Sequence, residues 1–326
     1  MIDFSRLVDN LTDLRLHYHY REGFVFTSIM APANIYDAIV VRHPANAVCW
    51  SPKFGYSSKA FEEHLDFINY HKIEKAMIIA DDLQFITKCP SLKYLCIVPA
   101  DSASSNFDYS PLYEMPNIYY LDCRTHYGGS REPLSTTIDC SKIKNLRTLY
   151  VRGTGYENVS MVDTLEKLYI SDCVISSIDC YPKLKMLELT SCKLNSLQGL
   201  EGLPSLQQLV IYRSRTLKDI SDLRHVTKSL RNLSVENCPQ IEDFSSISRL
   251  SHLESLSLIG SNDIDSIKFL ADLPALKWLI LTMNVVDGDM MPALSVPYVD
   301  IKGRKHYNLR NKDLPKSKDH IGYQLN

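Results

Sequence analysis

Nine cysteines and ten histidines are the side chains of this sequence that are best suited to hold a metal ion or act as nucleophiles. Cys173 and Cys192 occupy equivalent positions of a repeat, so their thiols could stack on neighbouring turns and contribute ligands to zinc. Cysteine, serine or asparagine takes the same position in the other copies, at Ser214, Cys238, Ser261 and Asn284. A hydrogen-bonding turn tolerates that exchange and a metal site does not. We therefore interpret these residues as turn residues and expect no metal site.

Recognisable catalytic motifs are missing from the sequence as well. It contains no G-x-S-x-G, no H-E-x-x-H and no G-x-x-x-x-G-K-[ST]. His17 and His19 flank Tyr18 without a second pair of ligands, and the acidic pair Asp81–Asp82 implies no partner acid. We predict no catalytic residue, no cofactor and no enzyme activity. The alternative is an enzyme that depends on a metal or on residues 1–71.

Composition and charge restrict the function classes further. The chain of 326 residues is 45% hydrophobic and has a net charge of −2, so no global field steers it to nucleic acid or to a membrane. The start, MIDFSRLVDNLTDLRL, lacks the cationic and apolar regions of a signal peptide, and no apolar run is long enough to span a membrane. The odd number of cysteines without C-x-x-C predicts reduced thiols. We expect a cytoplasmic, monomeric protein.

The elements that must position any site come from a repeated L-x-x-L-x-L frame. The first, fourth and sixth positions are apolar in every full copy, if Ala76 and Cys123 are counted. One frame would arise by chance roughly one time in eleven, so this succession is not accidental. The end of each frame alternates like a half-buried strand, and stacked copies would bury one another's apolar edges. Full frames begin at Ile73, Leu92, Ile118, Leu146, Leu165, Leu184, Leu206, Leu230, Leu253 and Leu276, and a truncated one begins at Val296.

The segment LNSLQGLEGLPSLQQLVIYRSRTLKDISDL, residues 194–223, resembles the repeat of leucine-rich-repeat proteins. Its short length and L-P-x-L motif are similar to the internalin-like or SDS22-like subclass. The resemblance covers residues 72–302. It implies an α/β leucine-rich-repeat solenoid with a curved parallel β-sheet on the concave face, short helical, 3-10 or irregular return legs, and an α+β N-terminal cap. The copies at Leu92 and Ile118 depart from the pattern, because the loops 99–116 and 125–143 are long.

The same resemblance implies a protein–protein interaction module that binds its partner on the concave face. The closing segment VDIKGRKHYN is similar to that of bacterial cytoplasmic repeat proteins. A bacterial origin and an immunity-type inhibitor of a toxin are therefore implied as a more specific alternative.

The two ends need separate interpretation. Residues 1–71 are expected to be an N-terminal cap or small module, with strands in GFVFTSIM and IYDAIVVRH and a helix over 58–71 that is capped by Ser58. Residues 303–326 form a basic tail, which we interpret as blunting the last sheet edge. The alternative is a nucleic-acid-binding arm, although no interleaved aromatic residues accompany its charge.

The outward strand positions, which are the third, fifth and seventh of each frame, are predicted to line the binding face. Four tyrosines there meet several cations, and tyrosine and arginine are enriched at binding hot spots. The alternative is that tyrosine simply suits a strand surface. The charge predicts a partner with an acidic or phosphorylated segment. The predicted partner-binding residues are Tyr94, Tyr120, Asp122, Arg124, Tyr150, Arg152, Lys167, Tyr169, Glu188 and Tyr212.

Overall fold

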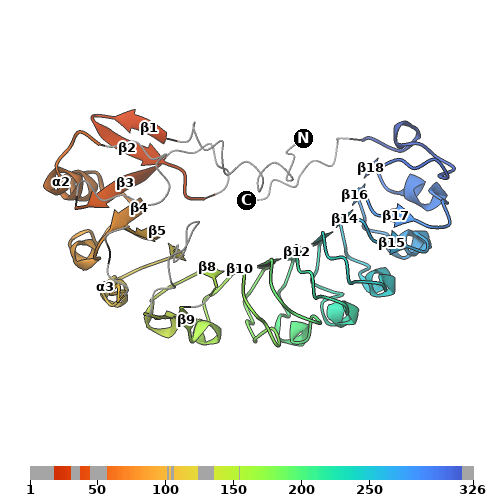
Figure 1. Cartoon of the computed structure of the whole chain (residues 1–326), viewed down its shortest axis with the longest axis horizontal. Coiled ribbons are helices and arrows are strands. Elements are labelled where there is room, and N and C mark those ends of the chain that lie inside the picture. Colours follow the sequence, from red (N-terminus) through yellow and green to blue (C-terminus); the bar gives the residue numbers. More distant parts are fainter. Residues whose placement is uncertain are drawn as a thin grey trace. The chain divides into compact units, whose positions relative to one another are not determined.

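The computed structural model describes residues 18–30, 37–44, 57–100, 103, 106–123, 136–153 and 155–317 (Figure 1). They fall into two compact units. The first contains the described residues up to Leu146 together with 155–159, and the second contains Arg147–Gly153 and residues 160–317. Among the described residues, no helix combines the length and the apolar character that crossing a membrane requires.

The first unit is built on a sheet with the strand order β1-β2-β3-β4-β5-β6. The pairs β1–β2 and β2–β3 are antiparallel, and the pairs from β3 to β6 are parallel. Its strands are β1 (Tyr18–Arg21), β2 (Phe24–Thr27), β3 (Ala38–His43), β4 (Lys75–Ala80), β5 (Tyr94–Pro99) and β6 (Tyr120–Cys123), with a separate parallel pair of β7 (Ile138–Asp139) and β9 (Tyr156–Glu157). Its helical segments are α2 (Phe61–His71), η2 (Gln84–Lys88), α3 (Pro111–Glu114) and η3 (Cys140–Lys142).

Both faces of this first sheet are covered around β4 and β5. The frame predicts that their fifth and seventh positions point outward, and that prediction is wrong here. These side chains are buried together with Val25 and Val40 from β2 and β3. The physical reason is visible in the sequence, because KAMIIA and YLCIVP are apolar on both faces, as in a doubly covered parallel sheet. The affected residues are Met77, Ile79, Cys96 and Val98.

Helix α2 begins later than the sequence predicts. Ser58 donates its backbone N–H to Gly23 O at 3.3 Å, so it is tied to the turn between β1 and β2 and does not cap the helix. The N-cap is Ala60, whose N–H donates to the Glu63 carboxylate at 2.7 Å. The buried face is formed by His64 and Ile68.

The second unit is a regular parallel sheet. Each strand begins two residues after a predicted frame, from Leu146 through Val296, so the frame and the leucine-rich-repeat solenoid are confirmed. The strand order is β8-β10-β11-β12-β13-β14-β16-β18. The strands are β8 (Thr148–Arg152), β10 (Lys167–Ser171), β11 (Met186–Thr190), β12 (Gln208–Tyr212), β13 (Asn232–Glu236), β14 (Ser255–Ile259), β16 (Trp278–Leu281) and β18 (Tyr298–Ile301).

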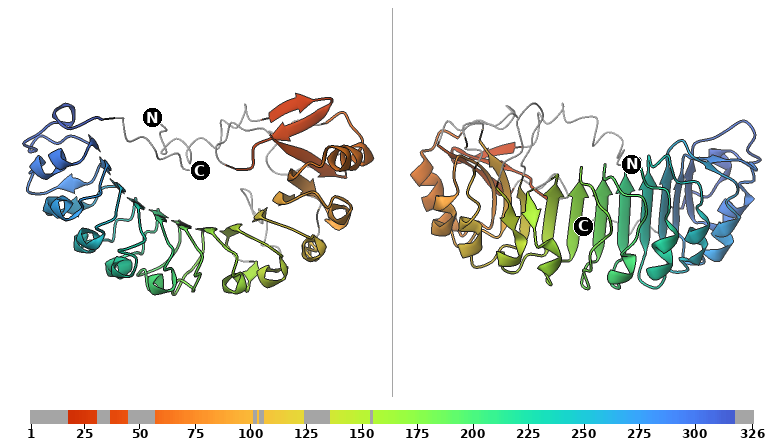
Figure 2. Two further views of the ribbon diagram at one scale, coloured as in Figure 1. Left: turned by 180° about the vertical axis from the view of Figure 1, so that it is seen from behind. Right: turned by 60° about the horizontal axis from the view of Figure 1, so that its bottom comes forward.

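The return legs of these coils carry short 3-10 segments on the side opposite to the sheet (Figure 2). They are η4 (Val159–Met161), η5 (Leu200–Gly202), η6 (Ser221–His225), η7 (Ser245–Arg249), η8 (Lys268–Asp272) and η9 (Met291–Ser295), with η10 (Asn311–Asp313) after the last strand and a small parallel pair of β15 (Asp263–Ile264) and β17 (Asn284–Val285). Between sheet and legs lie rows of leucine such as Leu187, Leu209 and Leu233, which are at most 2% exposed. Each such side chain contributes about 1.5–3 kcal/mol on burial.

The turns after the strands from β8 to β13 repeat one backbone conformation. Asp172, Ser191, Arg213 and Asn237 all have φ between 54° and 57°, and Gly153 takes the equivalent place at 65°. At the next position a thiol donates to a carbonyl of the preceding coil. Cys173 Sγ reaches Gly153 O at 3.0 Å, and Cys192 Sγ reaches Ile170 O at 3.3 Å. These contacts are those expected of turn residues that link coil to coil.

The turn after β14 differs from this pattern. After β14 the hydrogen-bonding residue is Asn262, whose Nδ2 donates to Cys238 O at 3.0 Å and to Ile241 O at 2.9 Å. The predicted turn residue Ser261 is exposed instead. The backbone stays extended at Gly260, with φ 158°, so the turn comes one residue later.

Residues 303–317, the described part of the basic C-terminal segment, fold onto the last strand. Lys316 forms an antiparallel bridge with Tyr298, and Val299 donates its N–H to Pro315 O at 2.9 Å. Asn311 Oδ1 accepts from Ile301 N–H at 3.0 Å, and Leu314 is buried. This segment therefore covers the exposed edge of β18, as the edge-blunting interpretation expects.

Gly199 provides a test of how tightly neighbouring coils pack. A Cβ at this residue would lie 1.9 Å from the Ile178 carbonyl oxygen, whereas a Cβ at Gly153 would meet nothing within 4 Å. We predict that Gly199→Ala lowers the free energy of unfolding by about 3 kcal/mol or more, because backbone must move. Gly153→Ala should cost only the left-handed strain, about 1–2 kcal/mol. Urea denaturation of both variants measures the difference, and equal losses would contradict the close approach of the coils.

Candidate functional site

The exposed sheet face of the second unit is formed by the third, fifth and seventh frame positions, which lie in three straight rows. The strands pair in parallel without a register shift, so equivalent residues stand side by side. Their side chains are half-buried, while the residues between them point into the core. The fifth-position row reads Tyr150, Tyr169, Glu188, Val210, Ser234, Ser257, Ile280 and Asp300.

Two of the predicted tyrosines stack at one end of this row. The rings of Tyr150 and Tyr169 are parallel within 4°, and their centroids are 4.0 Å apart. The Arg152 guanidinium lies 5.9 Å from the centre of the Tyr150 ring, and Lys167 is on the same strand as Tyr169. We call Tyr150, Arg152, Lys167 and Tyr169 the tyrosine patch. Burial raises the pKa of Tyr169, so its hydroxyl stays protonated and donates to Met186 Sδ at 3.3 Å.

Two carboxylates lie beside this patch. Glu188 accepts a hydrogen bond from Thr190 Oγ1 at 3.1 Å, and Glu236 accepts one from Ser234 Oγ at 2.7 Å. Burial raises the pKa of Glu188 and repulsion by Glu236 adds to the rise, while the Thr190 hydrogen bond and the Arg152 charge act against it. Within the described residues, neither glutamate has a cationic nitrogen within ion-pair distance. Among the described residues, the middle of the face therefore carries two carboxylates that form no ion pair.

Tyr212 extends the predicted site along the seventh-position row. It pairs in register with Thr190 on one side and with Glu236 on the other. The Arg213 guanidinium lies 4.9 Å from the centre of its ring. Six of the ten predicted residues are thus gathered on neighbouring strands of the second unit.

The other predicted residues belong to the first unit or are not described. Tyr94 is half-buried, with the Tyr119 ring 6.0 Å away and the Lys75 ammonium 5.6 Å from its own ring centre. Tyr120 is 3% exposed and donates its hydroxyl to Ile29 O at 2.7 Å. Asp122 is 2% exposed. Tyr120 and Asp122 are therefore buried, whereas the sequence analysis expected both on the binding face. Arg124 lies outside the described residues.

A second aromatic stack was missed by the sequence prediction. The rings of Trp278 and Tyr298 are 3.7 Å apart and nearly parallel, at 10°. The Lys316 ammonium lies 5.5 Å from the centre of the Tyr298 ring and 3.5 Å from the Asp300 carboxylate. The truncated frame at Val296 was a usable signal, because it places Tyr298 at a third position directly beside Trp278.

Burial raises the pKa of six of the described cysteines. Burial raises the pKa of Cys192 and of Cys238 to about 11 and that of Cys140 to about 12. Nucleophilic and metal-binding cysteines instead need a lowered pKa. Within the described residues, no group of three or more histidines, cysteines and acids is placed to hold a metal ion.

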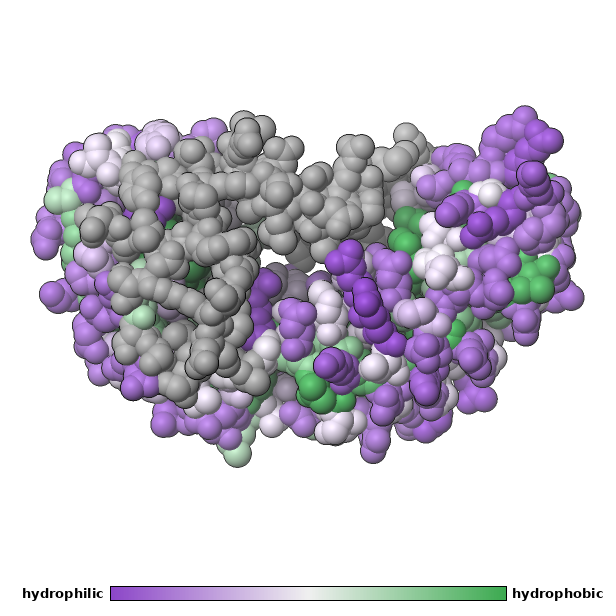
Figure 3. Space-filling model, in the orientation of Figure 1, coloured by the Kyte–Doolittle hydropathy of each residue, from purple (hydrophilic) through white to green (hydrophobic). Residues whose placement is uncertain are grey.

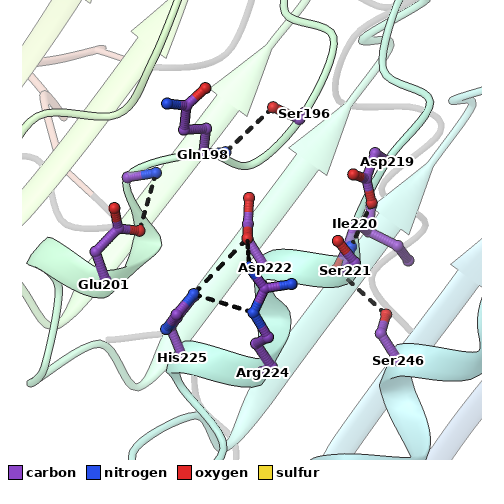
Figure 4. Close-up of polar contacts among 11 residues, drawn as sticks. Ser196, Gln198, Glu201, Asp219, Ile220, Ser221, Asp222, Arg224, His225 and Ser246 are labelled. Atoms are coloured by element: carbon purple, nitrogen blue, oxygen red, sulfur yellow. Dashed lines mark hydrogen bonds and ion pairs between the residues drawn. The ribbon is translucent and has the colours of Figure 1, made fainter.

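Polar side chains on the return legs fix neighbouring coils together (Figure 4). Asp222 pairs with Arg224 at 2.9 Å, and Arg224 Nε donates to His225 Nε2 at 3.2 Å. Ser246 Oγ donates to Ile220 O of the preceding leg at 3.2 Å. The histidine nitrogen is occupied by the arginine donor, so these contacts are structural. Where atoms are coloured, the surface is largely hydrophilic with separate small apolar patches (Figure 3).

Glu188 generates a test of the charge on this face. Folding raises its pKa above the ordinary value of 4.5, so the unfolded chain gives up this proton at lower pH. The charged carboxylate therefore costs folding free energy above the raised pKa, and this cost vanishes as the pH falls to 4.5. We predict that Glu188→Gln raises the free energy of unfolding at pH 7 and that the gain disappears near pH 4.5.

Urea denaturation over a pH series measures this gain. Glu242→Gln, at an exposed position on a return leg, is the matched control and should show no such gain. A Glu188→Gln gain that is absent at pH 7 or constant with pH would refute the assignment.

Comparisons with known proteins find similarity among solved structures. No family model and no curated protein matches the chain. Among solved structures, an internalin (inlF) from Listeria monocytogenes is 19% identical, with a TM-score of 0.42 over 72% of this chain and 75% of that one. The plant peptide hormone receptor RGFR1, solved in complex with RGF2, is 12% identical, with a TM-score of 0.34. The match covers 70% of this chain and 47% of the receptor chain, so this chain spans about half of the receptor's length. By its own frame, strand register and turns, the chain has the leucine-rich-repeat solenoid fold.

Proposed function

We propose that this chain is a protein-binding module and that its partner binds the exposed sheet face of the second unit. The observation that carries the proposal is the tyrosine patch, in which the Tyr150 and Tyr169 rings stack at 4.0 Å with Arg152 and Lys167 beside them. Aromatic and arginine side chains provide most of the binding energy at protein interfaces.

The rigidity of the patch supports this role. Tyr169 stacks on Tyr150 of the paired strand β8, and its hydroxyl donates a hydrogen bond to Met186 Sδ. Side chains that are already ordered lose little conformational entropy when a partner covers them. Each ring also keeps a polar hydroxyl at the edge of its apolar surface, which suits a surface that is wet when free and buried when bound.

The positive charge of the patch favours a particular chemistry in the partner segment that binds it. Arg152 and Lys167 place two cations at the β8–β10 end of the face, whereas Glu188 and Glu236 lie toward the middle. We therefore propose an acidic or phosphorylated segment of the partner opposite the tyrosine patch. Arg152 is suited to such a group because its planar guanidinium can bind a carboxylate or phosphate through two hydrogen bonds.

The other function classes receive less support. The thiols have raised pKa values, which does not favour cysteine catalysis. In the basic C-terminal segment, Lys316 pairs with Asp300 and Arg304 donates to Thr282 O, so these cations serve the fold of the cap. The described cysteines, eight in number, are all free. Free thiols support a reducing, cytoplasmic location, which we propose for this protein. We also propose that it is monomeric and of bacterial origin.

The tyrosine patch can be tested by a double substitution. We predict that Tyr150→Ala with Arg152→Ala weakens binding of a partner captured from the source cells by about 100-fold or more, since two hot-spot side chains are removed. Isothermal titration calorimetry with the purified partner measures the loss. The thermal unfolding midpoint should change little, because both side chains lie on the half-buried face outside the leucine core.

Matched controls remove an aromatic ring and an arginine elsewhere. Tyr70 is 83% exposed on α2, and Arg249 lies on a return leg. Tyr70→Ala with Arg249→Ala should bind the partner like the unchanged protein. Unchanged affinity of the Tyr150/Arg152 variant would rule out this placement of the binding site.

A further inference from the structure

We propose that Trp278 and Tyr298 form a second anchor for the same partner, and that this partner is a folded protein with a protruding basic surface between the two anchors. The inference rests on the proposed function, since it extends the footprint of a partner that already contacts the tyrosine patch. It names the kind of partner: a compact domain, not a short peptide.

The two aromatic stacks mirror each other across the exposed sheet face. In each stack one ring belongs to an outer strand and the other to an inner strand. Tyr150 on β8 backs Tyr169 on β10, and Tyr298 on β18 backs Trp278 on β16. Five strand steps separate the inner strands, β10 and β16. At about 4.8 Å for each step, the inner rings stand about 24 Å apart along the sheet.

Trp278 is half-buried, and its ring is held on one side by a stacking partner. Its stacking partner Tyr298 is itself fixed, because Lys316 lies over its ring, pairs with Asp300 and binds Asn311 Oδ1 at 2.8 Å. On the other side the register neighbour of Trp278 is Ser255, whose small side chain covers little of the indole. A large ring that is rigid and open on one face is the typical form of an interface anchor.

Two of the four strands between the anchors, β13 and β14, carry small side chains in the same rows. Ser234 and Ser257 occupy the fifth position of β13 and β14, and Asn232 and Ser255 occupy the third. These side chains rise less far above the sheet than the flanking rings. A partner that reaches both stacks must therefore protrude between them. An α-helix of a folded domain, about 10–12 Å in diameter, is narrow enough to lie there.

Charge complementarity defines the chemistry of the protruding element. Glu188 and Glu236 lie between the anchors, and their mutual repulsion is one cause of the raised pKa of Glu188. Within the described residues, no cation pairs with either carboxylate. A lysine or arginine from the partner placed there would relieve this repulsion. A peptide that only stretches from one stack to the other would pass above these carboxylates and the serines.

The test uses photo-crosslinking from two positions that are not themselves anchors. p-Benzoylphenylalanine is introduced singly in place of Thr148, on β8 beside the tyrosine patch, or of Ser255, beside Trp278. Each full-length variant is irradiated in lysate of the source cells, and the crosslinked residues are identified by mass spectrometry. The proposal expects both positions to crosslink one polypeptide, at sites more than about 20 residues apart in its sequence, with a lysine- or arginine-bearing segment at the Ser255 site.

The outcomes separate this inference from the proposed function. Crosslinking from Thr148 alone would leave the protein-binding function standing and overturn the second anchor. Crosslinking of one polypeptide within a span of about ten residues would overturn the folded partner in favour of a peptide. Crosslinking from neither position would contradict both proposals.

Substitutions provide a quantitative arm with the purified partner. Trp278→Ala should weaken binding at least tenfold, whereas Tyr70→Ala on α2 should leave it unchanged. Glu236→Gln should weaken binding and also reduce its dependence on salt, because one ionic contact is lost. Glu242→Gln, on the return-leg side, should change neither quantity. Full binding by the Trp278→Ala variant would overturn the second anchor.

Discussion

Each coil of the second unit leaves one apolar edge uncovered, and the next coil closes it. This stacking of leucine rows is the interaction on which the rest of the structure depends, because no single coil could bury its own core. It requires that every strand pair with its neighbour in the same register, from β8 to β18. A shift of one residue would turn every leucine to the surface. The close contact of return legs at Gly199 is a consequence of the same packing.

The fixed register also decides what the exposed face can present. Residues at equivalent positions of neighbouring strands stand about 4.8 Å apart, which is near the stacking distance of flat rings. Two aromatic residues in one row therefore stack, as Tyr150 does with Tyr169 and Trp278 does with Tyr298. Glu188 on β11 and Glu236 on β13 are separated by one strand, and their charges still repel each other. The core thus supplies a rigid support for the rows of side chains on the exposed face.

Much of the second unit could be predicted from the sequence because one rule, the L-x-x-L-x-L frame, fixes both strand position and facing. The same rule fails where its assumption fails. In β4 and β5 the outward positions are apolar, and Met77 and Val98 are buried by elements that the frame does not describe. Tyr120 and Asp122 became buried in the same unit, so their identity as tyrosine and aspartate gave no warning. Long-range packing decided these cases, and a local pattern contains no information about it.

The C-terminal segment shows the converse. Its basic residues suggested a tail, yet Lys316 contributes to an aromatic stack and to the cover of the last strand. The frame at Val296 predicts that Tyr298 lies beside Trp278. The sequence prediction considered only the tyrosine-rich early coils and therefore missed this stack. Composition indicated which segments are rich in basic or aromatic residues. The register of the parallel strands indicated which of these residues contact one another.

The claim that a partner covers the exposed sheet face is tested most directly by hydroxyl-radical footprinting of the chain with and without its partner. Oxidation of Tyr150, Tyr169 and Trp278 should fall strongly in the complex, while oxidation of Tyr70 on α2 stays the same. Unchanged oxidation of the Tyr150–Tyr169 pair in a saturated complex would contradict the account, since it would place the partner on another surface.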